Sequence, residues 1–416
     1  MHIPYGNGYI EYKNARASVL RSAVDKLRSR ESGSDIVLRA MQSPIDSPTL
    51  SELAAGKDNC VIIISDHTRP VPSRDILPHM IGQLRAGSPD INISLLVATG
   101  FHRGTTEKEL EAKLGADILS QVSIRVHDCR NPEENIQIGV LPSGAPCVID
   151  KLAAETQLLI AEGFIEPHFF AGFSGGRKSV LPGICDKVTV LGNHCSAFID
   201  SPFARTGILD GNPLHRDMLA AADMASLKYI VNVIIDEDKR TVAAFAGNFE
   251  TAHRKGCEFL LDYCRVAPAP ADIVICSNGG APLDRDLYQC VKGMTAAEAS
   301  CLDGGTIIMC ADCCDGHGGE GFYRTLTDCS SPAELYRQLM ARPWDRTIPD
   351  QWESQILARI LIKHRVIVVT RPQMRKTVED MKMSYAPDLE TALDMVGYDE
   401  SKKLTVIPNG VSVIVK

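Results

Sequence analysis

Several residues able to transfer protons or bind metal ions follow short apolar runs, where the chain would leave a buried strand. The run at 60–65 is followed by Asp66, His67, Thr68 and Arg69. His102 follows the run at 93–98 and lies between two glycines. A histidine titrates near neutral pH, so it can move a proton or, when neutral, ligate a metal. A proline-stiffened surface turn and a solvated loop histidine are the alternative interpretations.

The segment 166–179, which follows the apolar run at 158–163, is the most unusual one. It contains His168 before two phenylalanines, and its second half, GFSGGRKS, nearly spells a phosphate-binding P-loop. Arg177 stands where the second required glycine would be, so a backbone nest for a phosphate is a better prediction than an ATPase loop. Lys178 follows it directly. Farther on, His194 in a glycine-containing turn is a candidate metal ligand.

Polar residues also follow the apolar run at 272–277. Tyr288 and Lys292 are four residues apart and would share a helix face, with Gln289 beside them. An ordinary helix with an exposed lysine is the alternative. Taken together with the loops above, these residues predict an anionic ligand bound between two parts of the chain.

A cysteine cluster near residue 310 has the C-x-x-C spacing that a zinc ion or a redox couple could use. Its members are Cys310, Cys313, Cys314 and His317. No second C-x-x-C pair completes a tetrahedral site, so a strand end followed by a glycine-rich loop is the simpler interpretation.

The elements that would position these residues follow an α/β pattern. Apolar runs of four to eight residues, rich in Val and Ile, alternate with helix-length segments and predict largely parallel sheets. The runs lie at 60–65, 93–98, 158–163, 230–236, 272–277, 306–311 and 365–370. In such sheets ligands bind at the carboxyl ends of the strands, which is where the candidate residues fall.

Local patterns predict some boundaries. Thr106 and Glu109 have the spacing of a capping box and predict a helix start. The segment 239–247 resembles the return strand of a hairpin, which would make the first sheet mixed. Asn409 and Gly410, between two apolar runs, predict a hairpin that closes the chain.

The Pro- and Ala-rich stretch 266–272 is the best candidate for a domain boundary. We therefore predict two α/β domains, residues 1–265 and residues 266–416, with the active-site cleft between them.

Composition restricts the class of protein. The chain has 416 residues and a formal net charge of −8, without a block of Lys and Arg, which argues against a nucleic-acid or membrane partner. The first residues lack the pattern of an export signal, and nowhere do eighteen apolar residues run together. We therefore expect a cytoplasmic enzyme with a small-molecule substrate, in which most of the 14 cysteines are reduced core residues.

Five motifs, in order, resemble those of the lactate racemase family, whose members are nickel-pincer nucleotide-dependent racemases and epimerases of α-hydroxy acids. They are SDHTRPVP, TGFHRG, EPHFFAGFSGGRKSVLPGI, LGNH and DLYQCVKG. The resemblance extends from about residue 60 to Trp352. It implies two α/β domains with the active site between them.

The resemblance also implies a cofactor, nickel pyridinium-3,5-bisthiocarboxylic acid mononucleotide. By this resemblance Lys178 would carry the covalent tether and His194 would ligate nickel. His102 and His168 match the two catalytic histidines, while Arg69 and Lys292 match the residues that hold the substrate carboxylate. The remaining matches are Asp66, His67, Thr68, Arg69, Gln289 and Lys292 for cofactor binding, and Tyr288, Gln289 and Trp352 for the substrate pocket. Separate enzymes that build the cofactor and insert nickel are implied as partners.

This assignment agrees with the chemistry of the substrate class. The Cα–H of an unactivated 2-hydroxy acid is too weakly acidic for ordinary side-chain bases, whereas a hydride acceptor avoids that difficulty. One histidine would remove the hydroxyl proton as hydride leaves Cα, giving a 2-keto acid, and the other would act on the opposite face. Lactate is the predicted substrate. Malate, 2-hydroxyglutarate, an aromatic hydroxy acid and a sugar acid are alternatives, and a non-catalytic nucleotide-binding protein is a remote one.

Overall fold

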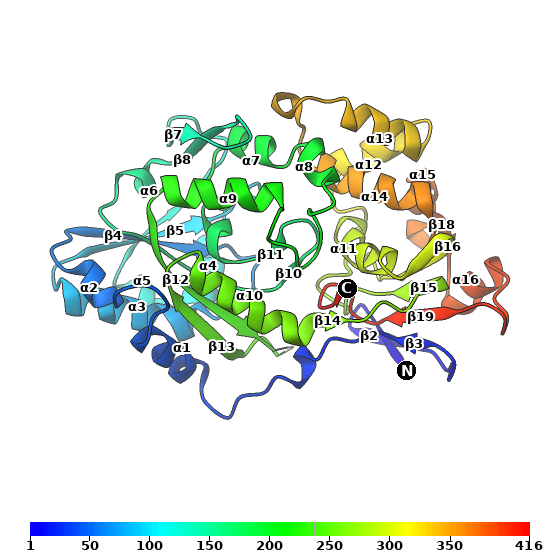
Figure 1. Cartoon of the computed structure of the whole chain (residues 1–416), viewed down its shortest axis with the longest axis horizontal. Coiled ribbons are helices and arrows are strands. Elements are labelled where there is room, and N and C mark those ends of the chain that lie inside the picture. Colours follow the sequence, from blue (N-terminus) through cyan, green and yellow to red (C-terminus); the bar gives the residue numbers. More distant parts are fainter. Residues whose placement is uncertain (237) are drawn as a thin grey trace.

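Two β-sheets with mostly parallel strands form the core of the computed structural model, which describes residues 1–236 and 238–416. Figure 1 shows the first sheet and its helices on the left and the second on the right. The α/β fold class predicted from the apolar runs is confirmed, since each run coincides with a strand. In the described residues no helix is both long and apolar enough to cross a membrane.

The first sheet has six strands, of which only the edge strand β13 is antiparallel to its neighbour. In spatial order they are β13 (Thr241–Gly247), β12 (Leu227–Ile235), β9 (Leu159–Phe164), β4 (Asn59–Ser65), β5 (Asn92–Ala98) and β6 (Ser123–Val126). The predicted hairpin at 239–247 is therefore confirmed, and the sheet is mixed.

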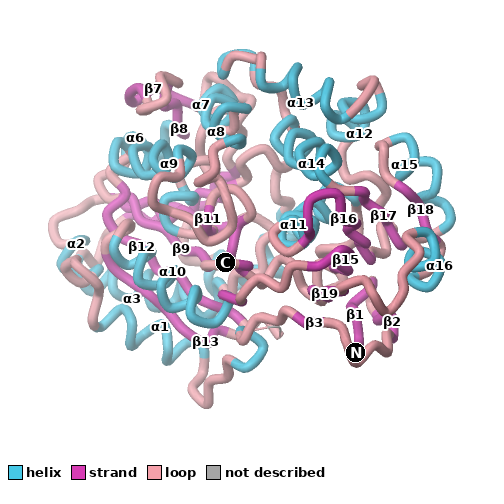
Figure 2. The backbone as a smooth tube through the Cα atoms, turned by 45° about the vertical axis from the view of Figure 1, so that its right-hand side comes forward, coloured by secondary structure: helices cyan, strands magenta, loops and turns pink. Residues whose placement is uncertain are grey.

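The second sheet also has six strands, and all its pairings are parallel. In spatial order they are β18 (Ser384–Ala386), β17 (Arg365–Val369), β16 (Cys301–Cys310), β15 (Ala271–Cys276), β19 (Leu404–Ile407) and β3 (Ser18–Val19). Strand β3 comes from the beginning of the chain, so the first residues pack with the second sheet, as Figure 2 also shows.

Shorter elements complete the structure. The two-stranded pairs are β1 (His2–Tyr5) with β2 (Gly8–Glu11), β7 (Asn135–Val140) with β8 (Pro146–Asp150), β10 (Pro167–His168) with β11 (Gly172–Phe173), and β14 (Arg265–Val266) with β20 (Ile414–Val415). The α-helices are α1 (Gly33–Gln42), α2 (Leu50–Ala54), α3 (Ser73–Gly87), α4 (Glu107–Leu114), α5 (Ala116–Leu119), α6 (Lys151–Glu155), α7 (Lys187–Asn193), α8 (Ser196–Asp200), α9 (Pro213–Met224), α10 (Thr251–Cys264), α11 (Leu287–Glu298), α12 (Glu320–Thr327), α13 (Pro332–Met340), α14 (Gln351–Lys363), α15 (Arg375–Asp380) and α16 (Leu389–Met395). Short 3₁₀ turns are η1 (Val24–Lys26), η2 (Gly176–Ser179), η3 (Trp344–Arg346) and η4 (Pro372–Met374).

The hairpin predicted at Asn409 and Gly410 is wrong. Strand β19 is already paired on both sides, with β15 and with β3, so no edge is left for a returning strand. The chain instead continues to β20, which pairs in parallel with β14. The predicted capping box is correct, because Thr106 caps α4 and Glu109 bonds back to it.

Strand β4 illustrates how both faces of the first sheet are buried. Successive side chains point to opposite faces of a strand, and here both sets are apolar. Ile62 and Ile64 join a cluster with residues of α3, whereas Val61 and Ile63 join a second cluster with residues of α9. Because both faces of the strand are covered, the polar residues that follow it lie at its carboxyl end, where they can contribute to a binding site.

Candidate active site

The candidate residues of the first half lie where its central strands end. Asp66 to Arg69 follow β4, His102 follows β5, and the segment with His168 and Lys178 follows β9. Because β9, β4 and β5 are parallel neighbours, their carboxyl ends open on the same edge of the sheet.

Asp66 holds His102 in a defined orientation. The Asp66 side chain is buried, and its Oδ2 lies 2.6 Å from His102 Nδ1, while Oδ1 accepts hydrogen bonds from the amide and hydroxyl of Thr68. Burial alone would raise the pKa of Asp66, but the hydrogen bond from His102, the charge that His102 carries when it is protonated, Thr68 and Arg69 lower it overall. A carboxylate only accepts, so His102 donates from Nδ1, and its Nε2 lone pair stays free to take a proton.

His168 has the opposite arrangement. Its Nδ1 accepts the backbone N–H of Ala171 at 3.3 Å, so the neutral ring carries its proton on Nε2. Its ring stacks on Phe169 and meets the edge of Phe170, at centroid distances of 5.1 and 4.6 Å. Burial, followed by the charges of neighbouring cations, lowers the pKa of His168 well below its ordinary value. His168 is therefore neutral here, with its proton on Nε2.

Arg177 organises the loop that carries His168 and Lys178. It is fully buried and donates to the carbonyls of Ala171 and Phe173, at 2.7 and 2.8 Å, and to His215 Nδ1 at 2.9 Å. Burial lowers its pKa to about 10. The guanidinium fork thus ties residues 171–173 of the loop to α9, a role that a glycine at this position could not fill.

The surroundings of Lys178 and His194 favour the uncharged forms that a tether and a metal ligand need. Burial and the charges of Arg177 and Arg69 lower the pKa of Lys178 well below its ordinary value, which favours a nucleophilic amine. His194 caps the end of α7, and its Nδ1 lies 3.0 Å from the carbonyl of Val190. It must donate there, which leaves Nε2 free as a ligand. Burial, then the charge of Lys178, lowers its pKa to about 3.

The second half contributes side chains from two packed helices, α11 and α14. Lys292 Nζ donates to Gln289 Oε1 at 2.6 Å, and Trp352 Nε1 donates to the Tyr288 hydroxyl at 3.0 Å. Asp286 caps α11 by accepting from the amide of Gln289. The cap and the two side-chain bonds fix the face of α11 that the sequence predicted.

Contacts between rings and cations join the two halves. The rings of His194 and Trp352 lie 5.0 Å apart, those of Phe101 and Trp352 lie 6.3 Å apart, and Lys292 Nζ lies 5.9 Å from the centre of the Phe169 ring. The charges of Arg69 and Lys292 also act on both His168 and Lys178. The result is a largely apolar, cationic region that suits a small carboxylate.

Most of the predicted site residues thus come together, but some do not. His67 turns toward α4, where its Nδ1 lies 3.1 Å from Thr105 Oγ1. In the described residues no three His, Cys, Asp or Glu side chains form a group that could hold a metal ion by themselves, the cysteines near residue 310 included.

Two buried side chains have roles that the sequence patterns do not indicate. Arg177 interrupts the P-loop pattern, and Glu353 follows Trp352 directly and is completely buried. Its spacing from Asp350 is typical of a capping box, a pattern that would predict an exposed acid.

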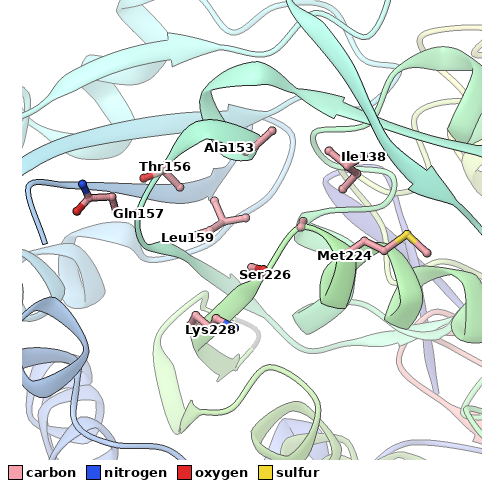
Figure 3. Close-up of a pocket in the computed structure, with 10 residues that line it drawn as sticks. Ile138, Ala153, Thr156, Gln157, Leu159, Met224, Ser226 and Lys228 are labelled. Carbon is pink, nitrogen blue, oxygen red and sulfur yellow. The ribbon is translucent and has the colours of Figure 1, made fainter.

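A cavity of about 140 Å³ lies away from this site. Figure 3 shows its wall, which includes Thr156, Gln157, Leu159 and Lys228 at the amino ends of β9 and β12. Because parallel strands present ligands at their carboxyl ends, and because none of the candidate residues lines this cavity, it plays no part in the site.

Comparison with known proteins gives full-length matches. Residues 5–207 match the family model for the lactate racemase N-terminal domain, and residues 266–415 match that for the C-terminal domain. The lactate racemase of Thermoanaerobacterium thermosaccharolyticum is 52% identical over 100% of this chain and 99% of its own. That of Lactiplantibacillus plantarum is 50% identical, covering 96% of this chain and 95% of its own.

Comparison with solved structures also gives matches that cover most of the chain. The lactate racemase apoprotein from T. thermosaccharolyticum superposes with a TM-score of 0.96, with 52% identity over 100% of this chain and 99% of that one. A protein from Thermotoga maritima has a TM-score of 0.65 and 19% identity over 92% of this chain and 98% of its own, a likeness that shows the fold alone.

Proposed function

Because the chain belongs to the lactate racemase family and is therefore an isomerase, we propose that it interconverts the two enantiomers of lactate. The observation that carries the proposal is the pair of histidines with opposite free nitrogens, His102 with a bare Nε2 and His168 with a protonated Nε2. A racemase needs one group that takes a proton and one that returns it. Cations from both halves accompany them, as an anionic hydroxy acid requires.

We further propose that the chain holds a nickel-pincer nucleotide, and its residues fit this group. His194 offers a neutral Nε2 to a metal, and Lys178 offers an amine whose lowered pKa favours the nucleophilic form for a covalent tether. Asp66, Thr68, Arg69, Gln289 and Lys292 would complete its binding site. When bound, the nucleotide would supply the acceptor and donor for the Cα hydride, which no side chain provides.

In this mechanism Arg69 and Lys292 bind the substrate carboxylate, and Gln289 holds the Lys292 ammonium in place. His102 Nε2 takes the hydroxyl proton, supported by the Asp66 carboxylate at its other nitrogen. A bound carboxylate would favour the imidazolium form of His168, which returns its Nε2 proton to the oxygen presented on the opposite side and becomes neutral. The reverse reaction uses the two histidines in exchanged roles. Phe169, Phe170 and Trp352 exclude water from the reacting atoms.

The test is to produce the full chain together with cofactor-building and nickel-inserting enzymes, and to follow each enantiomer of lactate by chiral chromatography. Nickel content and intact mass are measured on the same sample, and Lys178→Ala is the tether control. Racemisation with nickel and an added mass that Lys178→Ala lacks would support every part. Nickel and adduct with turnover only of malate or another hydroxy acid would change the substrate. Absence of nickel, adduct and turnover would overturn the proposal.

A further inference from the structure

Glu353 is a completely buried acid, and neither of its carboxylate oxygens has a hydrogen-bond partner in the described part of the chain. It lies in the first turn of α14, but the N-cap Asp350 makes no side-chain bond there. Burying a carboxylate without a partner is unfavourable, so capping does not explain why an acid is present.

The cation that acts on Glu353 is Lys292, on the facing helix α11. The helices are locked beside it by the hydrogen bond between Trp352, the residue before Glu353, and Tyr288, which lies one turn before Lys292. Lys292 donates to Gln289 but forms no direct ion pair with Glu353 among the described residues.

This separation suits a ligand-binding lysine. An ammonium group has three N–H donors, and Gln289 takes one of them. An acid in direct contact would take another and would compete with a substrate carboxylate. A buried acid at longer range still favours the charged lysine, because Coulomb interactions are weakly screened in the interior.

Lys292 needs such support because its surroundings are cationic. Burial, then the charge of Arg69, lowers the pKa of Lys292, while Glu353 is the strongest of the acids that raise it. Burial raises the pKa of Glu353 well above its ordinary value, and the charge of Lys292 opposes this rise. The charged or titratable groups facing this pair are Arg69, Glu166, His168, Lys178, Asp286, Tyr288 and Asp350.

We propose that Glu353 is the buried counter-charge of Lys292, a positioning residue that keeps the lysine ammonium protonated and ready to bind a carboxylate. The role in binding substrate rests on the proposed function, but the effect on the charge of Lys292 does not. Removal of the Glu353 charge should therefore make Lys292 lose its proton at a lower pH.

The first arm of the test uses the full-length apoprotein. Lys292 is only partly buried, so a reagent in solution can reach its amine. Trace acetic anhydride, which reacts with the free amine, is applied across pH 6 to 11. The labelled Lys292 peptide is then quantified by mass spectrometry. In Glu353→Gln the midpoint of labelling should fall by about one pH unit, and in Glu353→Asp it should stay near that of the unmodified protein. Glu298→Gln is the matched control, since Glu298 pairs with Arg359 between the same two helices. If Glu353→Gln does not fold, Glu353→Ala removes the same charge.

The second arm uses protein matured with its cofactor enzymes. The KM for lactate of Glu353→Gln should rise about tenfold above that of the unmodified enzyme on the alkaline side, with kcat within about twofold. Unchanged labelling midpoints, or a loss of kcat at constant KM, would overturn the counter-charge role. A shifted midpoint with no racemisation by the matured unmodified chain would leave that role intact and overturn the proposed function instead.

Discussion

His102 and His168 are the same residue type with different free nitrogens, and the difference comes from their immediate neighbours. A carboxylate fixes the proton of His102 on Nδ1, whereas a backbone amide occupies Nδ1 of His168. No sequence pattern predicts this, because Asp66 and Ala171 reach the rings through the fold. The sequence indicates both histidines as candidates, and the structure separates their tautomers.

Replacement of either histidine by glutamine should reduce kcat for lactate by about 100-fold or more, since each would lose its proton-transfer group. Cofactor loading, measured as nickel content and intact mass, should be retained. His79→Gln is the control, because His79 lies on α3 and bonds to Ser34 outside the site. Two variants with unmodified kcat would contradict the two-histidine mechanism.

Asp66 should contribute to stability in a pH-dependent way. Its pKa in the folded protein lies below the ordinary 3.8, so its contribution is present above that value and is lost as the pH falls through the lowered value. Asp66→Asn should therefore lower the free energy of unfolding by about 1.5–3 kcal/mol at pH 7. Urea denaturation at pH 7 and at pH 3 should show this difference shrinking on acidification. A difference that is constant with pH would mean that Asp66 acts only through packing.

At the scale of elements, the loop between β9 and α7 depends on glycines that the sequence alone could not rank. Gly175 and Gly176 both have positive φ angles, of 78° and 54°. A Cβ at Gly176 would lie 2.5 Å from the ring of His253, which in turn lies 2.8 Å from the carbonyl of Ser174. The P-loop resemblance predicts a backbone nest for a phosphate in this loop, which remains a prediction. The buried Arg177 that holds the loop is not part of the P-loop pattern.

Gly176→Ala should destabilise the protein by about 2–4 kcal/mol, because it adds steric conflict to the strain of a left-handed residue. Gly56→Ala is a matched control: Gly56 has a φ of 72°, but no atom lies within 4 Å of the position that an added methyl group would take. It should cost only about 1 kcal/mol. If urea denaturation showed equal losses of unfolding free energy in the two variants, the contact with His253 would be unimportant.

The seven strands that apolar runs rich in Val and Ile mark were predictable, since strands buried on both faces must be apolar throughout. The edge strands β3, β6 and β18 were not predicted, and the pairing of the strands was predicted only in part. The hairpin at 409–410 failed because β3, some 385 positions earlier in the chain, occupies the edge that it needed. Long-range pairing of this kind leaves no local pattern.

At the scale of the whole molecule, the site is assembled from both sheets and so is much of the core. One buried cluster contains Val61 and Leu159 of the first sheet together with Val274 and Ile307 of the second. The domain boundary near residue 265 remains a prediction. The continuous cluster indicates that the parts on either side of it share one apolar core. Apolar contacts that cross between them couple the stability of one part to that of the other.

This shared core predicts that the apoprotein unfolds in one cooperative transition. Leu214 on α9 and Leu357 on α14 are both fully buried in the shared cluster, one from each half. Leu214→Ala and Leu357→Ala should each lower the free energy of unfolding by about 2–5 kcal/mol and shift the same unfolding transition. The transition is followed by circular dichroism and by tryptophan fluorescence. The fluorescence reports on the second half, because Trp344 and Trp352 lie there. If Leu214→Ala moved a circular-dichroism transition while leaving the fluorescence transition in place, the halves would unfold separately. In that case the contacts between His194 and Trp352 would have to form anew whenever the site assembles, rather than being held by a common core.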